Sequence, residues 1–392
     1  MVVTKRPPRW RSARRSLARR ASTAGWPSRI SRPCRTGRLR MRPKSRNMQC
    51  YPAGRFSIPS VSSRVPGAPV CRICWIVIIA MSDLPVLVTG GAGFIGSHLV
   101  DALLARGYSV RVLDNLSSGK PDNLPLGHSR LELIEGNVAD AVRVREVMAG
   151  CGAVVHLAAV ASVQASVIDP VGTHRSNFIG TLNVCEAMRE QGLRRVLFAS
   201  SAAVYGNNGE GEVIDEDTPK APLTPYAADK LASEHYLDFY RRQHGLEPAI
   251  FRFFNIYGPR QDPSSPYSGV ISIFTERAAK GLPITLFGDG EQTRDFVYIA
   301  DLIGILLQAL EAPQILPGAV NVGLNRSLSL NRLLEEISAL FGGLPEVRRE
   351  AARPGDIRHS QASDRRLRER YRLPEPTPMA AGLASLLGSA RS

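Results

Sequence analysis

A glycine-rich segment between two apolar runs constrains the fold of this chain more than any other feature of its sequence. Val86 to Val88 is a short β-branched run typical of a buried parallel strand, and a helical pattern begins after the glycines that follow it. Gly90 permits a tight turn, Gly93 lets backbone N–H groups approach a pyrophosphate, and Gly96 lets helix and strand pack closely. A second apolar strand ends at Asp114, where a carboxylate can bind a ribose 2′-hydroxyl.

This order of strand, glycine loop, helix, strand and acid predicts a β-α-β unit that binds a dinucleotide. The acid at position 114 favours NAD over NADP. Strand signals continue at residues 131–134, 152–157, 195–199 and 249–254, with helical stretches between them, such as 181–190. We therefore expect an α/β fold, a Rossmann-type doubly wound parallel sheet with its ligand at the carboxyl ends of the strands.

The pattern changes after Gly258, which indicates a second domain. Pro, Ser and Gly crowd residues 259–269, and helical segments follow at 270–280, 300–311 and 329–341. We expect a dinucleotide-binding domain over 81–258, to which 291–325 return. Residues 259–290 and 326–380 are expected to form a smaller, mixed α/β domain that caps the sheet.

The first 80 residues differ in composition from the rest of the chain. They hold 19 Lys or Arg and no Asp or Glu, so the net charge of +15 for the whole chain leaves −4 for the other 312 residues. Without periodicity, this Arg-, Ser- and Pro-rich leader cannot bury enough apolar surface to offset ordering, and we expect disorder. A nucleic-acid or membrane tether and a transit peptide are alternatives, but we favour translation from Met81, with 1–80 an over-extended gene model.

Cysteine usage and charge predict a reducing, cytoplasmic setting for the body of the protein. Cys71 and Cys74 form a CxxC with no second pair, so we expect no metal site. Cys151 and Cys185 are expected to be small buried hydrophobic residues. The apolar run 75–80 is too short to span a bilayer, and the acidic body lacks a basic footprint for nucleic acid.

A second motif, running from Thr224 to Lys230, begins a helix and carries a candidate catalytic pair. Thr224 can cap the helix, Pro225 suits its first turn, and the pattern runs to Gly245. Tyr226 and Lys230 are four residues apart and share one face. An ammonium beside a phenol lowers the phenol pKa towards neutrality, and a nicotinamide cation adds to this. Tyr226 is thus predicted to be a general base that takes a proton from a sugar hydroxyl while hydride leaves the same carbon.

Four motifs together carry a family resemblance that spans about residues 84–375. They are Thr89-Gly-Gly-Ala-Gly-Phe-Ile-Gly96, His156-Leu-Ala-Ala159, Ser200-Ser-Ala-Ala-Val-Tyr-Gly206 and Tyr226-x-x-x-Lys230. With them the chain resembles the extended short-chain dehydrogenase/reductases and, within these, the UDP-galactose 4-epimerase group. The resemblance implies NAD as the cofactor, a UDP-sugar substrate bound by the smaller domain, and a homodimer in which two helices pack as a four-helix bundle.

The resemblance also implies roles for individual residues. Ser201 matches a catalytic hydroxyl that hydrogen-bonds the sugar O4, and Lys230 matches the residue that binds the nicotinamide ribose. The expected cofactor site comprises Gly90, Gly93, Phe94, Ile95, Gly96, Asp114, Asn115, Asn137, Val138, Ala158, Asn177, Tyr226 and Lys230. Asn137 stands where the family usually has Asp, but an amide still pairs with adenine. The expected substrate site comprises Ser201, Asn255, Arg294, Arg353, Asp356 and Ser360, in which the guanidinium groups suit phosphate.

The residues after Ser201 favour epimerisation over related reactions. In the 4,6-dehydratase branch an Asp-Glu pair stands where this chain has Ala202 and Ala203, and the decarboxylase branch has Glu at the second position. Epimerisation needs neither, because hydride leaves C4, the 4-keto sugar rotates and hydride returns. A 4-ketosugar reductase, which would use its cofactor stoichiometrically, and a non-catalytic dinucleotide-sensing or RNA-binding relative are the alternatives. Intact Ser201, Tyr226 and Lys230 argue against the latter.

Ser360 bears on the choice of sugar. In the epimerase family, the position four residues after the Asp of the Arg-x-Gly-Asp segment borders the C2 substituent. A large Tyr there restricts the enzyme to glucose and galactose, and a small residue leaves room for an N-acetyl group. Asp356 plus four is Ser360 in this chain, so the N-acetylated sugars are expected substrates as well.

Overall fold

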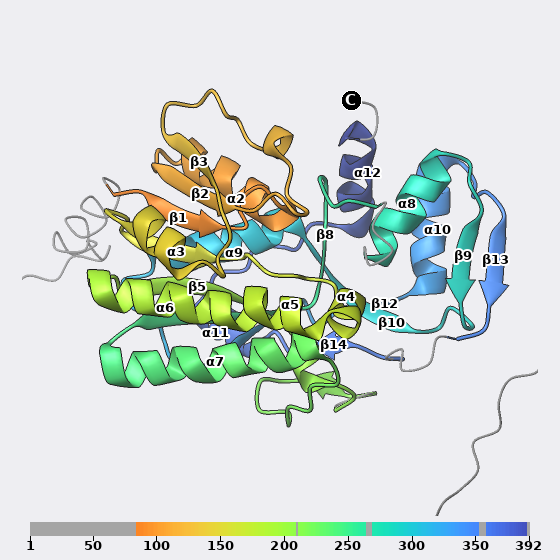
Figure 1. Cartoon of the computed structure of the whole chain (residues 1–392). Helices are drawn as coiled ribbons and strands as arrows, with labels where there is room; N and C mark the ends of the chain where they lie inside the picture. The colour runs from red at the N-terminus through yellow and green to blue at the C-terminus, as the bar shows by residue number, and fades with distance from the viewer. Residues whose placement is uncertain (1–83, 209–210, 264–268, 353–357, 390–392) are drawn as a thin grey trace, which may run out of the picture. The chain divides into compact units, whose positions relative to one another are not determined.

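The computed structural model describes residues 84–208, 211–263, 269–352 and 358–389. The basic leader over 1–80 and the expected substrate residues Arg353 and Asp356 therefore lie outside the described residues. The described residues belong to one unit, and the account below concerns this unit alone (Figure 1).

A parallel sheet of seven strands lies at the centre of this unit, in the order β11-β7-β5-β4-β1-β2-β3 (Figure 1). Its strands are β1 (Val86–Thr89), β2 (Val110–Asp114), β3 (Leu131–Glu135), β4 (Ala153–His156), β5 (Arg195–Ser201), β7 (Glu247–Phe253) and β11 (Val320–Val322). The strand order runs outward in both directions from the β1–β4 pair, so the topological switch point lies between these two strands. This topology confirms the predicted doubly wound fold.

Helices cover both faces of the sheet because side chains alternate along each strand. Val86 and Val88 belong to the core on one side, and Leu87 belongs to the core on the other. The first side is covered by α2 (Phe94–Ala105) and α9 (Ile299–Glu311). The second side is covered by α3 (Ala141–Met148), α6 (Gly180–Gln191) and α7 (Pro225–His244). Cys151 and Cys185 are free and buried in this second core, as expected.

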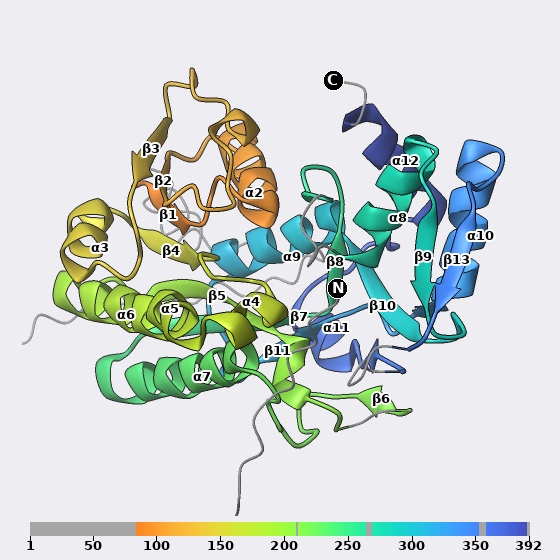
Figure 2. The same ribbon diagram turned by 45° about the vertical axis from the view of Figure 1, so that its right-hand side comes forward.

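A smaller group of elements forms a third core (Figure 2). It contains α8 (Val270–Ala279), α10 (Leu330–Phe341), α12 (Met379–Ser389) and the parallel pair β9 (Ile284–Phe287) and β13 (Val347–Glu350). A sheet of three short strands, β12 (Ser327–Ser329), β10 (Thr293–Tyr298) and β8 (Asn255–Tyr257), runs between this group and the large sheet.

The segment around α11 (Arg365–Arg370) does not follow the expected domain boundary. The sequence places 326–380 in the smaller domain, but Leu367 is fully buried in the core that α2 and α9 form with the large sheet. The Tyr371 ring lies 5.7 Å from the Phe251 ring, centroid to centroid. These apolar side chains draw the segment onto the large sheet, because burial there removes them from water.

Short elements complete the described chain. They are the parallel pair β6 (Val213–Ile214) and β14 (Gln361–Ala362), the helices α4 (Val163–Ile168) and α5 (Pro170–His174), a π-helical turn over Arg175–Ile179 and 3₁₀ turns at Pro121–Asn123 and Ala202–Tyr205. Within the described ranges, none of the helices combines the length and the apolar character needed to cross a membrane.

Candidate functional site

A cavity of about 440 Å³ lies at the carboxyl ends of the strands on both sides of the switch point. All the expected cofactor residues except Asn177 line it. The expected catalytic residues Ser201, Tyr226 and Lys230 line it too. The strand order therefore brings Gly90 and Lys230, 140 positions apart in the sequence, to the same cavity.

The glycine loop is built so that backbone, not side chains, faces the cavity. Gly90 has φ of +71°, and a Cβ on it would lie 2.7 Å from the Ala158 nitrogen. A Cβ on Gly96 would lie 2.2 Å from the Gly90 oxygen, so only glycine allows this close packing. α2 begins after Gly93 without a side-chain cap, which leaves N–H groups of its first turn to bind an anion. This cradle fits the pyrophosphate of a dinucleotide.

The carboxylate of Asp114 supports the loop and keeps capacity for a ligand. Its Oδ2 accepts from the Ala92 nitrogen and its Oδ1 from the Leu116 nitrogen, both at 2.9 Å. An ionised carboxylate has about four acceptor positions, so two remain for ribose hydroxyls. Neighbouring Asn115 is exposed and accepts from Ser117 through its Oδ1.

Two asparagines shape the walls of the cavity in different ways. Asn137 is exposed on the wall beside Val138, and its Oδ1 accepts from the Ala139 nitrogen at 2.9 Å. Asn177 is buried behind the wall and makes two hydrogen bonds to the backbone of Val160. Its Oδ1 accepts from the Val160 nitrogen at 2.7 Å, and its Nδ2 donates to the Val160 oxygen at 3.1 Å. Asn177 thus positions the loop after β4 and does not itself line the cavity.

α7 presents the candidate catalytic pair to the cavity. Its start is as predicted, since the Thr224 hydroxyl accepts from the Ala227 nitrogen at 3.3 Å. Tyr226 is buried and hydrogen-bonds the Ser201 side chain from the end of β5. Lys230 donates from Nζ to the Ala199 oxygen at 2.8 Å. The phenol, the hydroxyl and the ammonium therefore meet where β5 ends.

The pKa of the phenol differs from the expectation. The sequence predicts that Lys230 lowers the pKa of Tyr226, but burial raises it, against the smaller lowering effect of the Ser201 hydrogen bond. Burial also lowers the pKa of Lys230 to about 8, although Asp229 and Glu234 act to raise it. Desolvation disfavours the charged form of both groups, so phenolate formation needs a positive charge beside it.

Apart from Ser201, the expected substrate residues within the described chain lie on or beside β10. Asn255 lies opposite Phe296 in the β8–β10 pair and donates from Nδ2 to the Asp295 oxygen at 3.0 Å. Arg294 lies on the same strand, and the half-buried Ser360 donates from its nitrogen to the Thr293 oxygen at 3.2 Å. These three residues flank the cavity rather than line it.

Asp295 holds this region together and was missed by the sequence analysis. Its carboxylate is fully buried and accepts from the nitrogens of Leu324, Asn325 and Ala362 at 2.9 to 3.1 Å. Burial raises its pKa to about 6, against the opposing effect of these hydrogen bonds. The carboxylate thus ties Ala362 of β14, two residues after Ser360, to β10.

Further cavity residues follow the carboxyl ends of strands and were also missed. They include Ser117, Ser118, Leu157, Ala159, Val160, Ala161, Ser176, Ala199, Ser200, Phe253, Phe254, Ile256 and Gln261. Among the described residues, Gln261 is unusual in that its buried Oε1 has no hydrogen-bond partner. Most of these could have been found from the rule that ligands bind where parallel strands end, applied to β2, β4, β5 and β7 in turn.

Comparison with known proteins agrees with this geometry. The model of the NAD dependent epimerase/dehydratase family matches residues 86–323. The chain belongs to the NAD-dependent epimerase/dehydratase family. This confirms the resemblance found in the motifs, and NAD is the cofactor.

Individual members of the family are similar over most of their length. A UDP-glucose 4-epimerase from Mycolicibacterium smegmatis is 38% identical over 302 residues, which cover 76% of this chain and 96% of the relative. The solved UDP-N-acetylglucosamine 4-epimerase from Methanobrevibacter ruminantium, in complex with UDP-N-acetylmuramic acid, has a TM-score of 0.75 and 37% identity over 79% of this chain and 99% of its own. A Thermus thermophilus UDP-glucose 4-epimerase in complex with NAD has a TM-score of 0.72 and 40% identity, with the same coverage. Family members named as a decarboxylase and a dehydratase also match.

Proposed function

We propose that this protein is a NAD-dependent 4-epimerase of UDP-hexoses. The observation that carries the proposal is the meeting of Ser201, Tyr226 and Lys230 at the end of a cavity built for a dinucleotide. A proton acceptor, a hydroxyl to orient the sugar and a cation converge there, which is what oxidation of a secondary alcohol by hydride transfer requires.

In this mechanism, Tyr226 and Ser201 act on the sugar O4. Ser201 hydrogen-bonds O4 and orients it, while Tyr226 takes the O4 proton as hydride leaves C4. NAD, when bound, accepts this hydride and later returns it. Lys230 holds the nicotinamide ribose, and its charge favours the phenolate against the burial that raises the pKa of Tyr226. Tyr226 would give its proton back to O4 after the 4-keto sugar has rotated to present its opposite face, and C4 would then be inverted.

The segment after Ser201 favours epimerisation over elimination. Ala202 and Ala203 form a 3₁₀ turn there, and neither side chain can move a proton. A 4,6-dehydratase or a decarboxylase needs an acid or base at this place, whereas an epimerase does not.

The substrate proposal rests on the residues around β10. Arg294 offers a guanidinium for the UDP phosphates, and Asn255 lies across the strand pair from Phe296. Ser360 is a small residue in the segment that bonds to Thr293, which leaves space for a C2 substituent. We therefore include UDP-N-acetylglucosamine with UDP-glucose among the substrates.

A single incubation tests the function. Purified protein is mixed with UDP-glucose or UDP-N-acetylglucosamine, with no NAD added, and the C4 configuration is followed by NMR. Conversion to the galacto form is expected. Release of a 4-keto sugar would show a dehydratase-type reaction, and turnover that depends on added reduced cofactor would show a ketoreductase.

A further inference from the structure

The end of β5 is joined to α7 by three side-chain hydrogen bonds, and the proposed catalytic residues account for only two of them. Tyr226, Lys230 and Glu234 are spaced four apart and share one face of α7. Each bonds a different one of three consecutive residues of β5. The pairs are Tyr226 with Ser201, Lys230 with Ala199, and Glu234 with Ser200, whose hydroxyl donates to Glu234 Oε1 at 2.5 Å.

Glu234 also forms a buried ion pair with Arg252 of β7. Arg252 donates from Nη2 to Oε2 at 2.7 Å and from Nε to Oε1 at 3.0 Å, and both side chains are less than 10% exposed. A buried ion pair is stable only when its remaining polar atoms are bonded. Arg252 meets this condition through the Tyr205 hydroxyl at 2.8 Å and the Glu216 oxygen at 3.2 Å.

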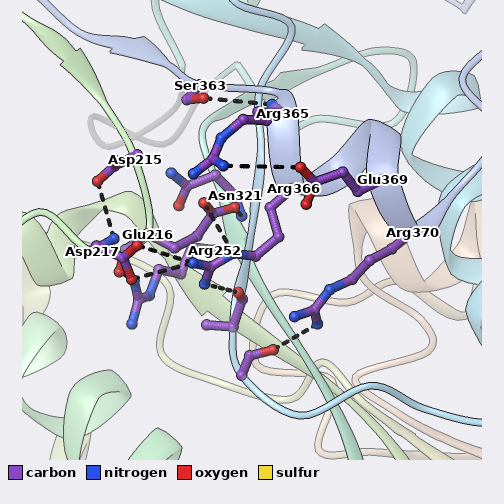
Figure 3. A network of polar contacts seen from close by, with 12 residues as sticks. Asp215, Glu216, Asp217, Arg252, Asn321, Ser363, Arg365, Arg366, Glu369 and Arg370 are labelled. Atoms are coloured by element: carbon purple, nitrogen blue, oxygen red, sulfur yellow. Dashed lines mark hydrogen bonds and ion pairs between the residues drawn. The ribbon is translucent and has the colours of Figure 1, made fainter.

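Arg252 belongs to a wider polar network, in which Figure 3 labels Arg252, Glu216 and Asn321. The Tyr205 hydroxyl donates to Asn321 Oδ1 at 2.6 Å, and the Asn321 nitrogen donates to Glu216 Oε1 at 2.8 Å. Tyr205 of the 3₁₀ turn and Glu216 of the loop after β6 bond Arg252, and Asn321 of β11 bonds both of them. Because these neighbours fix Arg252, its guanidinium holds the Glu234 carboxylate in one place. Glu234 in turn fixes Ser200, the residue next to Ser201.

We infer that Glu234 and Ser200 are a positioning pair, which holds the end of β5 against α7 so that Ser201, Tyr226 and Lys230 keep their mutual geometry. Neither residue exchanges a proton with substrate. The effect of this pair on turnover rests on the proposed function. The pair should also affect NAD affinity through the position of Lys230, and NAD binding is a property of the whole family. Misplacement of reacting groups by about 1 Å can lower the rate about 100-fold. Residues that fix the end of β5 against α7 therefore affect the rate without touching the substrate.

The test compares two buried serines that differ in what they hold. Ser200→Ala removes the hydroxyl bonded to Glu234 and leaves the ion pair with Arg252 intact. Ser233→Ala is the matched control, because Ser233 is fully buried on α7 and its two hydrogen bonds do not reach β5. Its hydroxyl bonds the Asp229 oxygen at 2.8 Å within the same helix and the Thr181 hydroxyl of α6 at 3.4 Å. Both variants lose one buried hydroxyl and its hydrogen bonding, so their midpoints of thermal unfolding should fall by similar amounts.

A second variant reaches the same contact from the other side. Glu234→Asp keeps the charge for Arg252 but shortens the side chain, and Glu234 does not line the cavity whereas Ser200 does. If the pair acts as a unit, the double variant Ser200→Ala/Glu234→Asp should be no worse in kcat than the poorer single variant.

For the positioning pair, kcat on UDP-glucose should fall about tenfold in Ser200→Ala and in Glu234→Asp, with KM within about twofold. The Kd for NAD, measured by calorimetry, should rise about threefold or more in both, while Ser233→Ala keeps kcat and both constants within about twofold of the unaltered protein. An equal fall of kcat in Ser200→Ala and Ser233→Ala would overturn the inference. So would a double variant in which the two falls of kcat add up. If the unaltered protein fails to epimerise UDP-sugars, the proposed function falls, and the NAD affinities alone decide the positioning role.

Discussion

We assign Tyr226 as the acceptor of the O4 proton, because its phenol lines the cavity beside the Ser201 hydroxyl and the Lys230 ammonium. We predict that Tyr226→Phe lowers kcat by about 10² to 10⁴, the range for a positioned proton transfer, while NAD remains bound. Turnover and the NAD content of the purified variant are the measurements. A loss of only a few-fold with NAD retained would show that another group is the base.

Ser360 allows a second prediction at the residue scale. Its backbone nitrogen is held by the Thr293 oxygen, one residue before Arg294, so the residue lies beside the strand that carries the proposed phosphate ligand. Ser360→Tyr should abolish activity on UDP-N-acetylglucosamine and keep activity on UDP-glucose, because a large side chain excludes the N-acetyl group sterically. The ratio of kcat/KM for the two sugars measures this. Equal effects on both sugars, or none, would show that Ser360 does not border C2.

At the scale of secondary structure, a buried histidine pins β1, β4 and α6 together. His156 of β4 lies between the hydroxyls of Thr89 at 2.7 Å and Thr181 at 3.1 Å. The Thr181 hydroxyl donates to the Asn177 oxygen, so Nε2 of His156 carries the proton and Nδ1 accepts from Thr89. Both ring nitrogens are thus satisfied in the neutral ring, and burial lowers the pKa of His156 to about 3.

This histidine should make the fold sensitive to acid. Its folded pKa lies below the unfolded value, so the unfolded chain binds the extra proton between about pH 6.5 and pH 3 and stability falls as the pH falls through this window. The contribution lost by pH 5 is about 2 kcal/mol. Denaturant unfolding at pH 7 and pH 5 should therefore show a smaller acid loss for His156→Asn than for the unaltered protein, by about that amount. An identical loss in both proteins would contradict the assignment.

The elements that could be predicted from sequence are those whose signal is local. β1, β2 and β5 are mainly apolar runs, and Thr224 and Pro225 are typical residues for the start of a helix. The bounds of these strands and the start of α7 were therefore predicted within two residues. β8, β10 and β12 were not predicted, because they are short and carry polar residues such as Asn255 and Arg294. The raised pKa of Tyr226 was also missed, since burial is set by the packing of α7 on β5 and not by the spacing of Tyr and Lys.

At the scale of the whole molecule, one surface of the described chain remains unpaired. α7 and the short helices before α6 expose apolar side chains, namely Tyr236, Phe239, Val167, Ile168 and Val171. Tyr236 packs edge-on against Phe178 and against Phe239, with ring centroids 5.1 and 6.4 Å apart, so the rings form a continuous stripe. Contiguous apolar surface of this kind marks an interaction site, and the same patch on two copies suits a two-fold dimer.

We predict that this stripe forms the homodimer implied by the family resemblance, with two helices of each copy in a four-helix bundle. Light scattering after size-exclusion chromatography should give a dimer for the unaltered protein and a monomer for Tyr236→Glu/Phe239→Glu, because burying four carboxylates across a two-fold axis is strongly unfavourable. Leu126→Glu is the control, since Leu126 is 51% exposed but lies in the loop after the 3₁₀ turn at Pro121–Asn123, away from the stripe. A monomeric unaltered protein would show that no such dimer forms. A double variant that stays dimeric would show that the interface lies elsewhere.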